Sequence, residues 1–363
     1  MSPKNFPWQA WIAIACIVAF IPYFFRENII GTDSYNTLLL FPLPFWAIKT
    51  ILLACTITAC ISIGWLARKI LEEKAWIAGL LPWASPIFAQ FFWNYENETI
   101  GFTIACIAIA LWFSEKQKSF WHSENKQLAI GLAIISALFW QANLLVLLSF
   151  SLGYLVSFVL LTATFLLLFW NKIGAFIPTT AVQENFPGFG LLFQGGLLLG
   201  LMEIKKCKTI ALPALFFLAL GFLNQRFAVF AIPFMAVLSA GFFLNKKNGL
   251  IRYCVLIMTV IVFLQTPFWS FSLPPTSQEL LATELAIEMA GGETIYNSWG
   301  TGYWIDYYGG KAFAHAGGVW DLNCTNCIVL DYFEHDCGLP INYNPKEDYG
   351  TLDFLPLLKV YKC

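Results

Sequence analysis

The feature that most constrains this chain is a series of long apolar segments between Trp8 and Phe271. A helix of about 20 apolar residues spans the ~30 Å hydrocarbon core of a bilayer, and inside that core only helices and closed barrels satisfy their backbone hydrogen bonds. The sequence therefore predicts a multi-span α-helical membrane protein. The predicted spans are Trp8–Phe25, Phe45–Ala67, Ala75–Phe92, Thr99–Phe113, Gly190–Ile204, Thr209–Leu223, Phe227–Leu244 and Leu250–Phe271, and a further run, Gln127–Trp170, holds three short crossings or one crossing and a re-entrant hairpin.

Composition and charge narrow the class further. Only 12% of the residues are charged and 58% are hydrophobic, whereas soluble domains carry about 25% charged residues. The net charge of −1 and the lack of a basic run interleaved with aromatics argue against a nucleic-acid partner. The first apolar segment follows a single lysine, Lys4, without a small-residue cleavage site, so we expect a retained span rather than a signal peptide.

The links between the spans predict the topology. Basic residues gather in four links, as Arg68, Lys69 and Lys74; Lys116, Lys118 and Lys126; Lys205, Lys206 and Lys208; and Lys246, Lys247 and Arg252. Links rich in lysine and arginine face the cytoplasm. Alternation then predicts a multi-pass protein of the cell membrane with a cytoplasmic N-terminus and an outside C-terminal domain. We expect residues 1–271 to form the transmembrane domain and residues 272–363 the small extracytoplasmic domain.

The tail after Phe271 has the pattern of a small α/β domain. Ser277 can cap a helix with Leu280, Leu281, Leu285 and Ile287 on one side, and Gly291 and Gly292 can end it. The stretches Glu293–Asn297, Cys327–Phe333 and Leu357–Tyr361 are typical of short strands.

Four cysteines lie in this tail: Cys324, Cys327, Cys337 and Cys363. They could form disulfides, stay as thiols, or bind zinc. Disulfides or thiols are favoured, because one Cys-x-x-Cys without a matching pair is a weak zinc signal.

Four carboxylates fall on the predicted outer face near membrane depth: Asp33, Glu96, Glu98 and Glu184. An unpaired carboxylate in hydrocarbon costs about 2.5–3.5 kcal/mol, and several converging carboxylates suit Mg²⁺ or Mn²⁺. The alternative is that each is an ordinary loop charge outside the lipid. Arg226, at the outer end of a span, suits a lipid phosphate that its guanidinium can hold bidentately; the alternative is an arginine that snorkels from a helix end.

Four stretches resemble one known family in its own order: "NYENETIGFTIACIAIAL", "KIGAFIPTTAVQENFPGF", "RFAVFAIPFMAV" and "SWGTGYWIDYYGGKAFAHAGG". They are similar to the motifs of the catalytic subunit of oligosaccharyltransferase, a family within the glycosyltransferase-C superfamily. By this resemblance the chain looks like a short, divergent member of that family. The resemblance implies a glycosyltransferase-C type helical membrane protein with a small C-terminal α/β outer domain.

The resemblance also implies the reaction. A glycan would pass from a polyprenyl or dolichyl (pyro)phosphate to the asparagine of an acceptor polypeptide at the outer face of the lipid bilayer. Asp33, Glu96 and Glu184 would hold Mn²⁺ or Mg²⁺ with support from Glu98. Asp33 and Glu184 would also engage the acceptor amide, and Arg226 would bind the lipid phosphate.

One motif departs from the family. The stretch Ser298-Trp299-Gly300-Thr301 lacks the first tryptophan and the aspartate of the family's W-W-D-Y-G signature, which in the family bind the +2 Ser/Thr of the acceptor. We assign the acceptor pocket to Trp299, Gly300 and Thr301 and expect weaker selection at +2, unless Thr301 or Asp306 supplies a substitute. The alternatives are an enzyme that takes one sugar from a polyprenyl monophosphate, and a carrier of lipid-linked glycans without catalysis.

Overall fold

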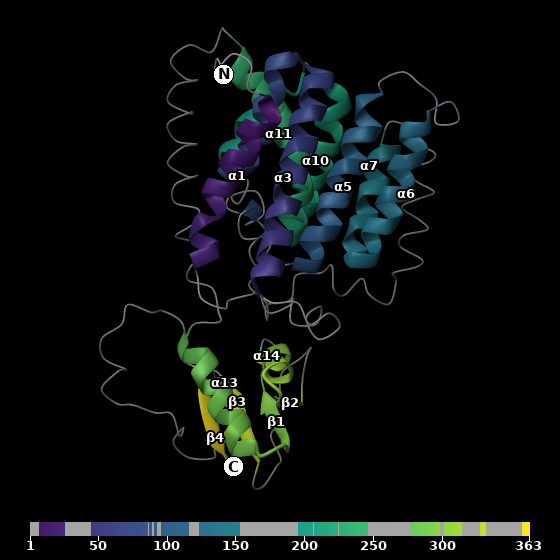
Figure 1. Ribbon diagram of the computed structural model, residues 1–363. Coiled ribbons are helices and arrows are strands. Elements are labelled where there is room, and N and C mark those ends of the chain that lie inside the picture. Colours follow the sequence, from purple (N-terminus) through teal and green to yellow (C-terminus); the bar gives the residue numbers. More distant parts are fainter. Residues whose placement is uncertain are drawn as a thin grey trace. The chain divides into compact units, whose positions relative to one another are not determined.

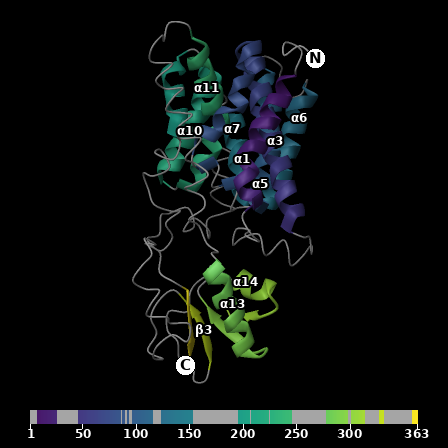
Figure 2. The ribbon, with the colours of Figure 1, turned by 60° about the vertical axis from the view of Figure 1, so that its left-hand side comes forward.

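The computed structural model describes residues 7–25, 45–85, 87–88, 91–92, 96–115, 123–152, 195–205, 207–223, 225–245, 277–297, 301–313, 327–331 and 358–363. The chain divides into two compact units (Figure 1, Figure 2). We call Met1–Phe25 with Lys49–Phe271 the helical unit, and Ser272–Cys363 with Arg26–Ile48 the C-terminal unit. The domain boundary predicted at residue 271 lies outside the described residues and stays a prediction.

The helical unit is built from long helices joined by short 3-10 helices. The α-helices are α1 (Trp8–Phe25), α3 (Phe45–Ile70), α5 (Glu96–Ser114), α6 (Glu124–Phe139), α7 (Leu145–Ser151), α10 (Lys208–Leu223) and α11 (Ile232–Leu244). The 3-10 helices are η3 (Glu73–Gly79), η4 (Leu81–Ala84), η6 (Gln141–Leu144), η9 (Gly195–Glu203) and η10 (Gln225–Ala231). Figure 1 shows α5, α6 and α7 side by side, and α6 packs on α5 while α11 packs on η9 and α10.

Two helices among the described residues are long and apolar enough to cross a membrane, Trp46–Ile70 and Phe227–Leu244. Shorter apolar helices cover Trp8–Ile21, Glu98–Ser114, Ala142–Ser151 and Lys208–Phe222. The predicted spans at 75–92 and 190–204 hold the 3-10 helices η3, η4 and η9. The span predicted at 250–271 lies outside the described residues. The larger number of crossings therefore stays a prediction.

The outward faces of the helices fit a lipid environment. In α6 the large residues point outward, with Leu138 83% exposed and Leu128 and Ile134 about half exposed, whereas Ala129 and Ser136 are buried. Soluble proteins show the opposite arrangement, with large apolar residues inside. Between helices in lipid, small residues allow close packing. The exposed large residues of α6 thus agree with the membrane location predicted from the sequence.

Helix α5 begins earlier than the sequence suggested. Its first residue is Glu96, three residues before the predicted start at Thr99, so Glu96 and Glu98 lie in the first turn of a helix rather than in a loop. A helix N-terminus carries a partial positive charge, which favours carboxylates there. The two acidic residues are thus held on a regular backbone.

The C-terminal unit is a four-stranded mixed sheet with two helices. Its elements are α13 (Ser277–Ala290), β1 (Thr294–Asn297), α14 (Gly302–Tyr307), β2 (Lys311–Ala312), β3 (Ile328–Asp331) and β4 (Lys359–Lys362). The strand order is β2-β1-β3-β4; β1 is parallel to β2 and β3, and β4 is antiparallel to β3. The helix, its two-glycine end and the three strand regions predicted from the sequence are confirmed.

Helix α13 packs on β1, β3 and β4 through small residues. Ala282, Ala286 and Ala290 are buried, and their spacing of four places them on one stripe of the helix. The prediction that Leu281 belongs to the buried side is wrong, because this side chain is 64% exposed. The small alanine stripe lets the helix axis approach the sheet closely.

The tail cysteines that the structure describes, Cys327 and Cys363, are both in disulfide form, which is one of the two states favoured from the sequence. The backbone N–H of Cys363 also donates to the carbonyl oxygen of Cys327 at 2.9 Å. A disulfide sulfur is not a thiolate, so these two residues are not zinc ligands. Disulfides persist in oxidising compartments, which agrees with the predicted outside location of this unit.

Reduction of the full chain should loosen the C-terminal unit selectively. Loss of a disulfide from a small domain costs about 2–5 kcal/mol, so dithiothreitol should speed hydrogen exchange in residues 277–297 and leave α5 and α11 unchanged. Cys207→Ala is the control, since Cys207 is in thiol form and the substitution should not affect the C-terminal unit. Equal exchange in that unit with and without reductant would contradict a stabilising role.

Candidate functional site

The carboxylates of α5 mark one end of the helical unit, which we call the acidic end. Glu98 is buried, with 8% of its surface exposed. The next residue, Thr99, donates its hydroxyl to the carbonyl oxygen of Phe91 at 3.2 Å. The first turn of α5 is therefore fixed to the segment that precedes it, and Glu98 is held within packed protein.

Four aromatic rings pack together next to the first turn of α5, and we call them the aromatic cluster: Phe91, Phe102, Trp140 and Phe230. Phe91 contacts Phe102 with ring centroids 5.5 Å apart and Trp140 at 5.4 Å. Phe230 lies 6.0 Å from Phe102 and stacks on Trp140 at 5.0 Å. Because Phe102 belongs to α5 and Phe230 to η10, the cluster brings the second turn of α5 beside the end of η10.

Arg226 is carried by η10. It precedes Phe230 by four residues, roughly 8 Å of 3-10 helix, and Glu98 precedes Phe102 by four residues, roughly 6 Å of α-helix. Further along, Phe113 of α5 contacts Phe234 of α11 at 5.4 Å, so the two helices run in the same direction. The backbones that carry Glu98 and Arg226 therefore lie at the same end of the unit.

A buried lysine, Lys49, also lies at this end. Only 4% of its surface is exposed, and it stands one turn into α3. Thr103 of α5 donates its hydroxyl to the carbonyl oxygen of Cys55 in α3 at 3.3 Å; Lys49 precedes Cys55 by six residues and Glu98 precedes Thr103 by five, which is about 9 and 7.5 Å along the two helices. A buried lysine of α3 and a buried glutamate of α5 thus lie six and five residues before the hydrogen bond that joins the two helices.

The close packing of α5 on α6 supports the acidic end. A Cβ on Gly101 would lie 2.5 Å from Nδ2 of Asn143 and 2.9 Å from the carbonyl oxygen of Ser136, so only glycine fits there. Asn143 is fully buried, and its Nδ2 donates to that carbonyl at 2.9 Å. Its Oδ1 has no hydrogen-bond partner among the described residues. The site therefore includes a buried polar atom, Oδ1 of Asn143, in the side chain that packs on Gly101, which is three residues after Glu98.

Several of these residues were missed by the sequence analysis. Lys49 is the only charged residue in its apolar run before Arg68, and Gln141 and Asn143 interrupt the apolar run at 127–170. A charge or amide inside a membrane segment is a functional signal. Reading those interruptions as closely as the acidic motifs would have found both positions.

The structure describes only part of the predicted site. Asp33, Glu184, Trp299 and Gly300 lie outside the described residues, and so do the side chains of Glu96 and Arg226. Within the described ranges there is no group of three His, Cys, Asp or Glu that could hold a metal. Of the four predicted carboxylates, Glu98 is the one whose side chain the structure describes, and it is a buried hard-oxygen donor of the kind Mg²⁺ or Mn²⁺ prefers. The metal site and the catalytic pair stay predictions.

Thr301 and Asp306, suggested as substitutes for binding the acceptor, are each held within the packing or hydrogen bonding of the C-terminal unit. Thr301 is fully buried at the start of α14. Oδ1 of Asp306 accepts a hydrogen bond from the backbone N–H of Ala312 at 2.9 Å. The neighbouring N–H, that of Phe313, donates to Oδ1 of Asn297 at 3.1 Å. Asp306 and Asn297 thus hold the edge strand β2, and the acceptor pocket stays a prediction.

Comparisons with known proteins give a structural likeness only. No family model and no curated protein sequence matches the chain. Its fold is similar to the apo crystal structure of the oligosaccharyltransferase of Archaeoglobus fulgidus, with a TM-score of 0.54 and 12% identity over 86% of this chain and 65% of that chain.

Two further structures from the same organism are also similar. One is the archaeal oligosaccharyltransferase in complex with an inhibitory peptide and a dolichol-phosphate (TM-score 0.47, 13% identity, 86% of this chain and 65% of that chain). The other is a complex with Zn and sulfate (TM-score 0.41, 12% identity, 84% and 62%). This chain spans less than two thirds of the length of those proteins. Its fold is therefore similar to that of an archaeal oligosaccharyltransferase.

Proposed function

We propose that this chain is a membrane glycosyltransferase that moves a glycan from a polyprenyl or dolichyl (pyro)phosphate to an acceptor asparagine outside the cell membrane. The observation that supports the proposal is the acidic end of the helical unit, where the contact of Phe102 with Phe230 puts the backbones of Glu98 and Arg226 at the same end. The likeness of the fold to an oligosaccharyltransferase supports it, as do the four sequence stretches.

The proposed chemistry follows from residue types. The bond between the sugar carbon and the phosphate oxygen breaks, and a bond to the asparagine nitrogen forms with inversion at the sugar carbon. Asp33 and Glu184 accept hydrogen bonds from the amide N–H₂ group, which frees its lone pair for attack, and a carboxylate takes the proton that is lost. Asp33, Glu96 and Glu184, with support from Glu98, would hold Mn²⁺ or Mg²⁺, which would supply positive charge against the phosphate that leaves. Arg226 holds that phosphate bidentately.

A direct assay tests the proposal. The full chain in lipid nanodiscs is incubated with a labelled lipid-linked glycan and peptides that carry Asn-x-Thr, Asn-x-Ser or Asn-x-Ala, with Mn²⁺ or with a chelator. We expect labelled peptide with Mn²⁺ and a large loss with the chelator. Transfer of one sugar from a polyprenyl monophosphate, without transfer from the pyrophosphate donor, would replace the proposal with the monophosphate enzyme. Donor binding without any transfer would favour the carrier.

Lys49 and Arg226 should both act on the donor. Lys49 lies at the acidic end, as does the backbone of Arg226, and a phosphate bound there needs a fixed counter-charge. Arg226→Lys keeps the charge but loses the fork-shaped guanidinium, and Lys49→Met keeps the length and removes the charge. We expect the donor KM to rise about tenfold in each variant, as for loss of a charged hydrogen bond, with the acceptor KM unchanged.

The matched control for those variants is Lys69→Met, which removes a cation from the last turn of α3 at the other end of the same helix. Its donor KM should equal that of the wild type. An effect of Lys49→Met on the acceptor KM alone would contradict a role with the donor.

A further inference from the structure

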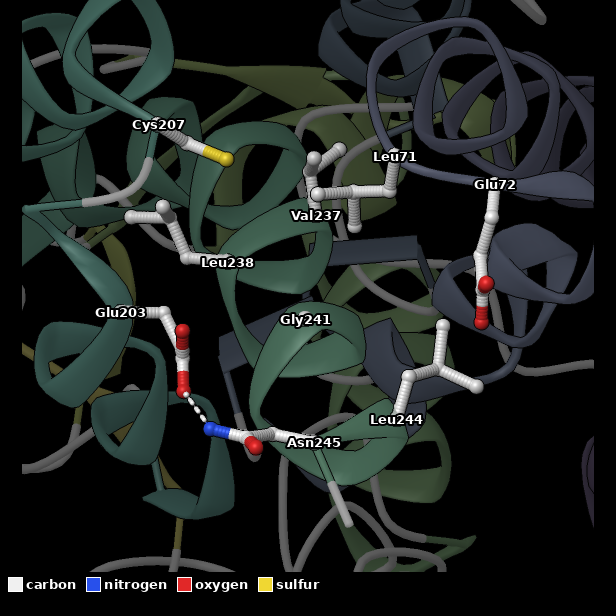
Figure 3. A pocket seen from close by; sticks show the side chains of 9 residues that line it. All are labelled: Leu71, Glu72, Glu203, Cys207, Val237, Leu238, Gly241, Leu244 and Asn245. Carbon is white, nitrogen blue, oxygen red and sulfur yellow. Dashed lines mark hydrogen bonds between the residues drawn. The ribbon is translucent and has the colours of Figure 1, made fainter. Parts of the chain in front are cut away.

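A second candidate site lies far from the acidic end. A cavity of about 320 Å³ lies between the last turns of α11, the end of η9 and the residues that follow α3 (Figure 3). Leu71, Val237, Leu238 and Leu244 form its apolar wall. Its first lining residue on α11 is Val237, eleven residues after Arg226 of η10, which is roughly 20 Å along η10 and α11. The cavity is therefore not part of the proposed glycan-transfer site.

Two carboxylates line this cavity. Glu203 is only 5% exposed, and its Oε1 accepts a hydrogen bond from Nδ2 of Asn245 at 3.1 Å. Glu72 is exposed, and Figure 3 shows the two glutamates on opposite sides of Gly241. Among the described residues that line the cavity there is no lysine or arginine. A carboxylate has about four acceptor positions, and Asn245 occupies one of those of Glu203.

Basic residues lie close in the chain to the residues that line the cavity. Lys205 and Lys208 flank the lining residues Glu203 and Cys207 in the chain, and Arg68 stands three residues before Leu71. Met202, next to Glu203, is 63% exposed, which is an apolar surface suited to lipid. A ligand that fits this arrangement carries a positive group for the cavity, a negative group for the basic residues around it, and an apolar part.

We propose that this cavity binds the ammonium group of a primary amine, with Glu203 as its main acceptor. An ammonium has three N–H donors and no acceptor, which matches a carboxylate-lined cavity. The source that the surroundings favour is an aminophospholipid of the phosphatidylethanolamine type, whose phosphate would meet Lys205 and Lys208. The volume lies at the small end of ligand pockets, about 300–1,000 Å³, which suits a head group rather than a whole lipid.

Cys207 offers a reporter for the charge inside the cavity, because it lines the cavity and is in thiol form. The full chain in phosphatidylcholine nanodiscs is treated with a cationic or an anionic methanethiosulfonate reagent, and each rate at Cys207 is divided by the rate with a simple free thiol. We expect the cationic reagent to be favoured about tenfold, as for charge-steered encounters. Cys207→Ser gives the background from other cysteines.

Charge and shape variants sharpen this test. Glu203→Gln should bring the ratio of the two rates close to one, whereas Glu73→Gln should not change it, since Glu73 is 91% exposed and pairs with Arg68. A Cβ on Gly241 would lie 3.7 Å from Cδ1 of Leu71 and 3.9 Å from Cγ of Glu203, so alanine fits at ordinary contact. Gly241→Leu should fill the cavity and slow both reagents, and Gly241→Ala should not.

The ligand itself is tested by protection of Cys207. Phosphatidylethanolamine nanodiscs should slow its labelling about fivefold or more relative to phosphatidylcholine, as expected for a site that is mostly occupied, and Glu203→Gln should remove the protection. Equal protection by soluble ethanolamine in phosphatidylcholine nanodiscs would support the ammonium site and assign it to a free amine. Protection by neither amine, or preference of wild-type Cys207 for the anionic reagent, would overturn the proposal.

Discussion

Glu184→Gln and Asp33→Asn should each lower glycan transfer by about two orders of magnitude or more, while the chain keeps its expression level and thermal midpoint. Each substitution preserves size and shape and removes one negative charge. The proposed chemistry needs those charges twice, to hold a hard cation and to accept the N–H groups of the acceptor amide. Loss of one preorganised group at a reacting centre typically costs about 10²–10³ in rate. Single-turnover assays with saturating donor measure the effect on the chemical step.

The matched control for these variants is Glu73→Gln. It makes the same change of a carboxylate to an amide, but its side chain is 91% exposed and its ion pair with Arg68, at 3.5 Å, is of the kind worth about 0–1 kcal/mol. Its turnover should equal that of the wild type. If Glu184→Gln and Asp33→Asn were also fully active, the proposed catalytic pair would be wrong and the carrier function would be favoured.

Gly101→Ala should destabilise the helical unit. The new Cβ would lie 2.9 Å from the carbonyl oxygen of Ser136, and a backbone oxygen cannot move without shifting α6. Overpacking of this kind costs about 1–3 kcal/mol, so the thermal midpoint should fall by roughly 5 °C. Thermal unfolding of the purified chain, followed by tryptophan fluorescence, measures it.

Gly131→Ala is the control, because a Cβ at Gly131 of α6 would meet no atom within 4 Å. Alanine is a better helix former than glycine by about 1 kcal/mol, so the midpoint should stay or rise. Equal midpoints for the two variants would mean that α5 and α6 do not pack through Gly101.

The sequence predicted those elements whose signals are local. Ser277 and the pair Gly291 and Gly292 bound α13 as expected, because chain reversal after a helix favours glycine with positive φ, here 55° and 95°. The strand regions were also predicted, since β-branched and aromatic residues gather there. The polar residues that separate the apolar runs also predicted the positions of helices such as α1, α3, α5 and α10.

What the sequence did not predict depends on contacts between distant segments. The burial of Lys49 and Asn143 follows from how α3, α5 and α6 pack, and neither position has a local motif. Leu281 was assigned to the buried side of α13 because it is large and apolar. The buried side is instead the stripe of Ala282, Ala286 and Ala290. The convergence of Glu98 and η10 rests on the contact of Phe102 with Phe230, 128 residues apart in the chain.

The unequal lengths of the helices have a consequence for the surrounding lipid. The two described helices that are long and apolar enough to cross a membrane are Trp46–Ile70, with 25 residues, and Phe227–Leu244, with 18, which is about 38 and 29 Å. A hydrocarbon core of ~30 Å is shorter than the first helix and close to the length of the second, so in the proposed membrane location α3 would have to tilt or extend into the head groups. Such hydrophobic mismatch costs fractions of a kcal/mol per Å. Acyl-chain length in the host bilayer would thereby set the tilt of α3.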